Sequence, residues 1–162
     1  MTRKILVVED GEKHRTDADE FFRGLEGVDI VYAKNYDEAW TVLYNHRNEQ
    51  YHLDGAIVDI YMPQSDASGL KDSYPPQVQD HIRAMATNQE PCGVGLAVLL
   101  EKADIPFVLN TAGYHHGAKY EWINGLCSSV GWPLIDASGD YSSEAETKDW
   151  RKAYESLEQR MK

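Results

Sequence analysis

The stretch Lys4-Ile5-Leu6-Val7-Val8, followed at once by Glu9-Asp10, decides the fold. Its apolar run is continuous and rich in β-branched residues, which is typical of a strand buried on both faces of a sheet. Further short apolar runs follow at residues 28–33, 55–59, 105–109 and 133–135. Longer segments of helical period separate these runs. The alternation predicts a doubly wound α/β domain with a five-stranded parallel sheet.

The apolar spacing between the runs predicts the covering helices. They are expected at residues 12–25, 35–46, 94–103, 118–130 and 147–161. Asn35 is suited to cap the second of these helices, with Glu38 three residues on as its capping partner.

One segment breaks this rhythm. Between the third strand and the helix at residues 94–103 lie about thirty residues, where connections usually take two to six. Within them Val78, Ile82 and Met85 have helical spacing. We therefore predict a helical insertion after the third strand, at about residues 64–91. It would serve as a lid or a partner-binding helix, or it would be a packed decoration.

The size and net charge of the chain limit its domain count and its binding partners. The chain has 162 residues, 42% of them apolar and 27% charged, which suits one soluble globular domain over residues 1–162. Lys and Arg number 16 against 27 Asp and Glu, a net charge of −11. Nucleic acid and anionic membranes are poor partners for such a surface, because phosphate binding needs clustered cations. Metal cations and basic protein surfaces are the better candidates.

Nothing in the sequence marks an exported or membrane-bound chain. The longest apolar stretch, residues 94–100, is too short to span a bilayer, and the N-terminus has no signal-peptide pattern. Cys92 and Cys127 are too few for a disulfide framework and are expected to be free thiols. These features favour a cytoplasmic location.

Polar residues collect where the strands end. Glu9-Asp10 follow the first strand, Asp59 ends the third, and Thr111 follows the fourth. Ligands of open α/β sheets bind at the carboxyl ends of the strands, so these side chains are expected to converge. Close carboxylates repel unless a cation joins them, and carboxylates with waters suit Mg²⁺. Taken alone, Glu9-Asp10 would equally suit the N-terminus of a helix.

Three segments resemble those of response-regulator receiver domains. They are Lys4-Ile-Leu-Val-Val-Glu-Asp10, Ile57-Val-Asp-Ile-Tyr-Met-Pro63 and Ile105-Pro-Phe-Val-Leu-Asn-Thr-Ala112. The similarity covers nearly the whole chain outside the insertion. It implies a flavodoxin-like fold with strand order 2-1-3-4-5.

The resemblance also implies roles for individual residues. Asp59 would be the phosphoacceptor, taking its phosphoryl group from a histidine kinase or a phosphotransfer protein. Glu9, Asp10 and Asp59 would bind Mg²⁺ together with the backbone carbonyl of Tyr61. Thr111 would donate its hydroxyl to the phosphoryl oxygen.

One departure from the family concerns a cation. Receiver domains carry a lysine at the end of the fifth strand that pairs with the phosphoryl group, and no lysine lies between Lys119 and Lys148. We therefore expect this lysine to be missing. Lys119 is a candidate substitute, in a loop where His115 and His116 are interpreted as exposed polar residues.

The resulting hypothesis is a stand-alone receiver, a Mg²⁺-dependent phosphoacceptor in a phosphorelay that signals through contacts with a downstream protein and is not an enzyme. The alternative is a pseudo-receiver, an interaction module that phosphorylation does not control. A haloacid-dehalogenase-type phosphatase is disfavoured because Tyr61 stands where that chemistry needs a second aspartate. A flavodoxin is disfavoured because residues 11–14 are not a Ser/Thr-rich phosphate loop.

Overall fold

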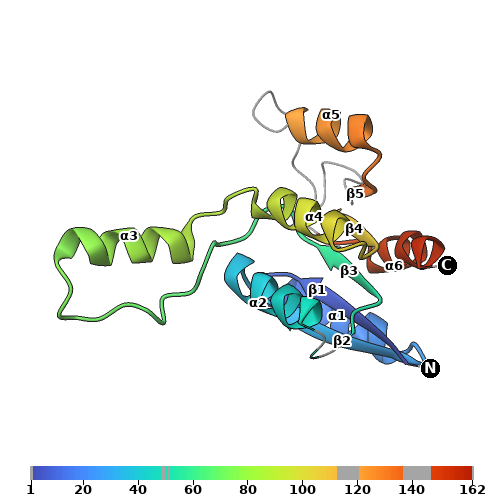
Figure 1. Ribbon diagram of the computed structural model, residues 1–162, viewed down its shortest axis with the longest axis horizontal. Helices are drawn as coiled ribbons and strands as arrows, with labels where there is room; N and C mark the ends of the chain where they lie inside the picture. The colour runs from blue at the N-terminus through green and yellow to red at the C-terminus, as the bar shows by residue number, and fades with distance from the viewer. Residues whose placement is uncertain (1, 49, 51, 113–120, 137–146, 162) are drawn as a thin grey trace.

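Parallel strands form one sheet in the order β2-β1-β3-β4-β5. The computed structural model describes residues 2–48, 50, 52–112, 121–136 and 147–161 (Figure 1). The strands are β1 (Arg3–Val8), β2 (Val28–Ala33), β3 (Gly55–Val58), β4 (Phe107–Thr111) and β5 (Leu134–Asp136). Both the parallel pairing and the strand order agree with prediction.

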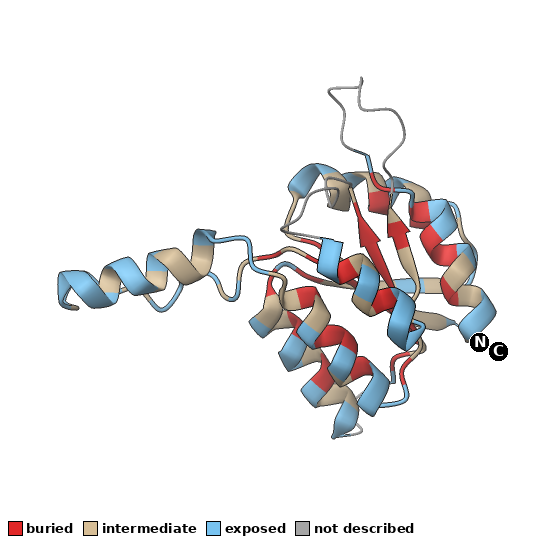
Figure 2. Cartoon of the chain, turned by 90° about the horizontal axis from the view of Figure 1, so that it is seen from above, coloured by how far each residue is buried: buried red, intermediate tan, exposed pale blue. Residues whose placement is uncertain are grey.

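Helices cover both faces of this sheet. The helices of the described residues are α1 (Glu12–Arg23), α2 (Tyr36–Arg47), α3 (Pro76–Thr87), α4 (Cys92–Lys102), α5 (Glu121–Val130) and α6 (Trp150–Arg160), and all but α3 pack on the sheet. Residues of α1 and α6 pack on one face, and residues of α2, α4 and α5 pack on the other (Figures 1 and 2). The predicted flavodoxin-like α/β fold is confirmed.

The continuous apolar run of β1 follows from this layering. Leu6 and Val8 point into the core beneath α2, α4 and α5, whereas Ile5 and Val7 point into the core beneath α1 and α6. All four are at most 1% exposed. Because successive side chains of a strand face opposite sides, a strand covered on both faces needs no polar alternation.

Local capping sets several boundaries. The Asn35 side chain accepts a hydrogen bond from the Glu38 backbone N–H at 2.8 Å, so the predicted cap of α2 is confirmed. Helix α6 begins at Trp150, later than the predicted residue 147, because the Asp149 carboxylate accepts from the Lys152 N–H and fixes the first turn there. Strand β4 runs on to Thr111, which pairs with β5.

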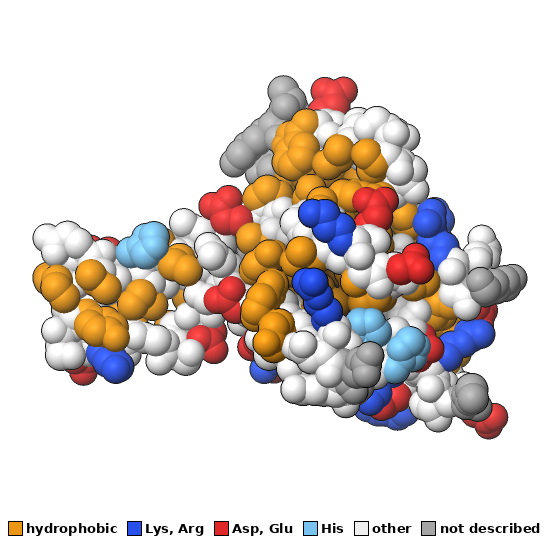
Figure 3. Space-filling model, in the orientation of Figure 1, with side chains coloured by type: hydrophobic (Ala, Val, Ile, Leu, Met, Phe, Trp, Pro, Cys, Tyr) orange, Lys and Arg blue, Asp and Glu red, His pale blue; other side chains and the backbone are white. Residues whose placement is uncertain are grey.

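The insertion forms an arm that projects from the sheet and its helices (Figures 1 and 2). Its helix α3 covers the predicted segment, yet none of its residues is buried. Val78 is 42% exposed, and apolar side chains gather along the arm in Figure 3. These exposures disfavour the packed-decoration interpretation.

Within the described residues, no helix combines the length and the apolar character that crossing a bilayer requires. Cys92 and Cys127 are both free thiols, as predicted.

Candidate functional site

The ends of β1 and β3 bring the predicted carboxylates together. The two strands are neighbours with Val7 paired to Ile57, and the Asp59 N–H donates to the Val8 carbonyl at 2.9 Å. Glu9 and Asp59 therefore continue the same face of the sheet, two residues beyond that pair. With Asp10 they offer carboxylate oxygens that all lie within 4.8 Å of one another.

A lysine occupies this cluster. The Lys148 Nζ lies 2.9 Å from Asp59 Oδ2 and also donates to Glu9 Oε2. Its side chain is 2% exposed, Glu9 is 1% exposed, and the Asp59 side chain is 12% exposed. The lysine is thus a buried counter-ion shared by two carboxylates.

The expectation that the site lacks a lysine is therefore wrong. That expectation sought the lysine at the end of β5 itself, whereas residues 137–147 separate this strand from Lys148. Lys148 comes directly before Asp149, the cap of α6, and the packing of α6 on the sheet places its side chain at the site. No sequence spacing signals this. Lys119, His115 and His116 lie outside the described residues.

Burial dominates the electrostatics. It raises the pKa of Glu9 to about 7, against the attraction of Lys148, and the Asp59 charge adds to the rise. Burial likewise raises the pKa of Asp59, again opposed by Lys148. Burial lowers the pKa of Lys148, but Asp59 and Glu9 outweigh it, so the net shift is upward. Burial, followed by the Lys148 charge, lowers the pKa of His14 in the first turn of α1.

Further hydrogen bonds hold the loop after β1. Glu9 Oε1 accepts from the Gly11 N–H at 3.0 Å. The Arg15 guanidinium donates to the backbone carbonyls of Glu9 and Asp10. The Asp10 carboxylate accepts from the Gln89 side-chain amide at 2.7 Å, a contact supplied by the insertion. Sequence reasoning identified neither Arg15 nor Gln89, since each acts through a contact that no motif specifies.

Comparison with solved structures identifies the fold. One neighbour is RcsB from Salmonella enterica serovar Typhimurium, bound to promoter rprA in the presence of phosphomimetic BeF3− (TM-score 0.56, 12% identity, 97% of this chain and 99% of that chain covered). Another is the bacteriophytochrome response regulator AtBRR (TM-score 0.52, 17% identity, 98% and 94% covered). The fold is that of a response-regulator receiver domain. No protein-family model matches the sequence, and no curated protein matches it.

The end of β4 borders this site. Thr111 is the last residue of β4 and is 3% exposed. Because Ile57 pairs with Val108, Asn110 continues the same face of the sheet as Asp59. Asn110 is 1% exposed, and among the described residues neither atom of its amide has a hydrogen-bond partner. Tyr61 lies in the loop after β3, and the role of its carbonyl stays a prediction.

The residues of this site fit a hard divalent cation. Three carboxylates lie close together and one lysine contacts two of them, which leaves negative charge uncompensated, and carboxylate oxygens are the ligands that Mg²⁺ prefers. The unpartnered amide of Asn110 beside Asp59 also points to a polar occupant, because buried polar groups normally find a partner. Glu9, Asp10 and Asp59 are the residues that would hold the ion.

Proposed function

We propose that this chain is a receiver that accepts a phosphoryl group on Asp59 in a Mg²⁺-dependent reaction. The contact between the buried Lys148 and Asp59, beside Glu9 and Asp10, carries the proposal. A buried carboxylate with a fixed cation at one oxygen is suited to take up a phosphoryl group and to hold its added charge.

The transfer is a nucleophilic displacement. A carboxylate oxygen of Asp59 attacks the phosphorus of a phosphohistidine on a histidine kinase or phosphotransfer protein. The P–O bond forms as the P–N bond breaks, and the electron pair returns to the imidazole, which takes up a proton. The product is an acyl phosphate on Asp59.

The surrounding residues share the charge of the phosphoryl group. When bound, Mg²⁺ offsets negative charge on the transferring group. Lys148 already contacts Asp59 and pairs with a phosphoryl oxygen once the carboxylate is esterified. Thr111 donates its hydroxyl to another oxygen, which draws the end of β4 toward Asp59.

Output passes through protein contacts. The net charge of −11 argues against nucleic acid and anionic membrane as direct ligands. We propose that the chain turns over no substrate other than its own phosphoryl group, so it is a signalling protein rather than an enzyme. Its two free cysteines support a reducing, cytoplasmic setting.

Intact mass spectrometry after incubation with acetyl phosphate and Mg²⁺ tests this proposal. We expect one added phosphoryl group that is absent in Asp59→Asn and in the presence of a chelator. Beryllofluoride, the phosphomimetic named for the RcsB neighbour, offers a second test, since it should bind the wild type and not Asp59→Asn.

The alternative is a pseudo-receiver that phosphorylation does not control. The missing lysine no longer supports this alternative, because Lys148 lies in the site. The insertion still favours a dedicated interaction role. A protein that binds Mg²⁺ but gains no phosphoryl group from acetyl phosphate or a phosphohistidine donor would favour this alternative.

A further inference from the structure

The insertion leaves and rejoins the receiver at the phosphoacceptor loop. Met62 and Glu90 form an antiparallel bridge, with N–H···O distances of 3.1 and 3.2 Å in the two directions. The Gly93 N–H donates to the Ile60 carbonyl at 3.0 Å. The outgoing and returning segments are therefore joined to each other beside Asp59. We call Met62 and residues 89–93 the root of the arm.

The root is pressed against the backbone of Asp59. A Cβ atom placed on Gly93 would lie 2.0 Å from the Asp59 carbonyl oxygen and 2.8 Å from Ile60 Cα. No side chain fits between Gly93 and the Asp59 backbone. Because the two segments are in such close contact, a displacement of Asp59 displaces the root as well, and the reverse.

Gln89 carries this connection to a carboxylate of the site. Its side-chain amide donates to Asp10 Oδ2 at 2.7 Å. The neighbouring residue, Glu90, is the one that bridges to Met62. Glu90 thus bonds to the outgoing segment of the arm, and Gln89 bonds to the Asp10 carboxylate, which lies close to the carboxylates of Glu9 and Asp59.

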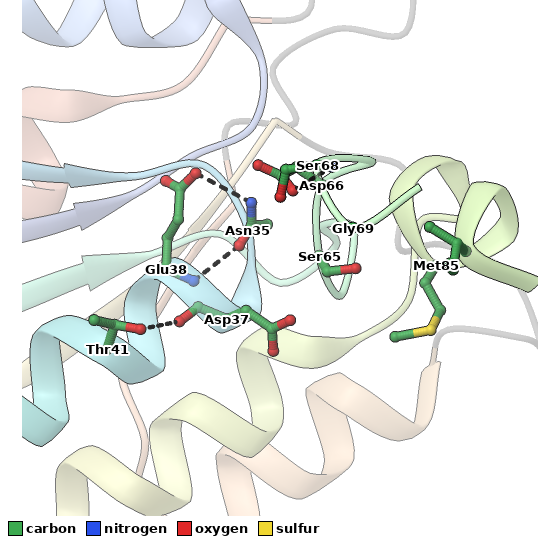
Figure 4. A pocket seen from close by; sticks show the side chains of 10 residues that line it. Asn35, Asp37, Glu38, Thr41, Ser65, Asp66, Ser68, Gly69 and Met85 are labelled. Atoms are coloured by element: carbon green, nitrogen blue, oxygen red, sulfur yellow. Dashed lines mark hydrogen bonds between the residues drawn. The ribbon is translucent and has the colours of Figure 1, made fainter. Parts of the chain in front are cut away.

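Beyond its root the arm is weakly attached. Helix α3 buries no residue. A cavity of about 430 Å³ opens between the arm and the start of α2, with Asn35 and Asp37 on one side and Ser65, Gly69 and Met85 on the other (Figure 4). The bonds that tie the arm to the receiver therefore concentrate at the root and at the start of α2, where the Tyr36 and Asp37 N–H groups donate to residues 63 and 64.

We propose that Gln89 is a positioning residue of the cation site and that it couples occupancy of this site to the arm. Its amide fixes the orientation of the Asp10 carboxylate, which leaves the other carboxylate oxygen for the cation. Partners that orient metal ligands commonly change metal affinity when removed. The coupling is reciprocal, so a bound cation also holds Gln89 and stabilises the root. This inference rests on the proposed cation site.

The test is a Mg²⁺ titration of the full chain, with the wild type beside Gln89→Leu. The backbone amides of Gly11 and Ile60 report binding in ¹H–¹⁵N spectra, since they donate to Glu9 and Asp59. We expect Gln89→Leu to weaken Mg²⁺ binding about tenfold. Without divalent cations, its urea midpoint should equal that of the wild type. The matched control is Gln79→Leu, because Gln79 lies in α3 and its side-chain hydrogen bonds among the described residues stay within the insertion: the amide donates to the backbone carbonyls of residues 72 and 74, and its oxygen accepts from Arg83.

Hydrogen exchange supplies the second readout. Mg²⁺ should slow exchange of the Met62 and Glu90 amides in the wild type and in Gln79→Leu, and it should leave them unchanged in Gln89→Leu. The coupling would be overturned if the wild type and Gln89→Leu bind Mg²⁺ equally well, or if Mg²⁺ does not change the exchange rates of the Met62 and Glu90 amides in the wild type. Either result leaves the phosphoacceptor proposal standing. A wild type that binds no Mg²⁺ would overturn the coupling and the cation site together.

Discussion

Replacing Lys148 with methionine removes the buried cation and keeps most of the side chain's volume. The lysine is 2% exposed and contacts carboxylates on both β1 and β3. Its loss leaves one carboxylate oxygen each of Glu9, Asp10 and Asp59 within 4.8 Å of one another, without the lysine that contacts two of the three carboxylates. The folded state therefore bears an uncompensated cluster of like charges that the unfolded chain does not have.

The expected cost is large and depends on pH. Removing one partner of a buried ion pair costs about 3–5 kcal/mol. The variant escapes part of this cost by protonating Glu9, whose pKa is about 7 even with Lys148 present and rises further without it. A carboxyl with a raised folded-state pKa loses stability as pH rises. The destabilisation should therefore grow by about 1.4 kcal/mol per pH unit wherever the variant holds one more proton than the wild type.

Urea unfolding followed by circular dichroism at pH 6 and pH 8, without divalent cations, measures this cost. With a slope of about 2 kcal/mol per molar urea, the midpoint at pH 8 should fall by about 2 M. The matched control is Lys152→Met, since Lys152 lies on α6 but is exposed. Mg²⁺ should restore part of the stability of Lys148→Met, because it binds the folded state. If Lys148→Met and Lys152→Met unfold at the same urea concentration at pH 8, the buried counter-ion role is refuted.

Three further predictions use the same unfolding measurements on the cation-free protein. Since burial raises the pKa of Glu9 from 4.5 to about 7, its contribution to the free energy of unfolding should fall by about 3 kcal/mol as pH rises from 4.5 to 7. Glu9→Gln should remove that pH dependence, and an unchanged pH profile would contradict the assignment. Gly93→Ala should destabilise by about 1–3 kcal/mol or more, because its Cβ meets the Asp59 backbone. Gly125→Ala, with open space around Gly125, should be neutral or stabilising, and equal effects of the two changes would count against the close contact. Asn110→Leu should stabilise by about 1–3 kcal/mol by removing a buried unpartnered amide, and a loss of stability would reveal a partner.

The strands were largely predictable because β1 and β3 are buried on both faces, whereas their order was predicted from the resemblance to receiver domains. A continuous run such as Ile5–Val8 has few other places in a globular domain, and its burial at 0–1% exposure matches that expectation. The cap of α2 was predictable for a similar reason, since Asn35 and Glu38 interact within one turn. Boundaries that depend on longer-range packing, such as the start of α4 at Cys92, were less accurate.

The residues of the candidate site likewise fall into those that local sequence predicts and those that only long-range packing places. The sequence by itself predicted that Glu9, Asp10 and Asp59 come together, because each directly follows or ends a strand and the carboxyl ends of parallel strands meet at one edge. The role of Thr111 stays a prediction. Only the tertiary structure decided Lys148 and Gln89. One reaches the carboxylates through the packing of α6 and the other through the root of the arm. Contacts across 139 and 79 residues of chain leave no local pattern, so the cation of this site and its link to the insertion become visible only when the chain is folded.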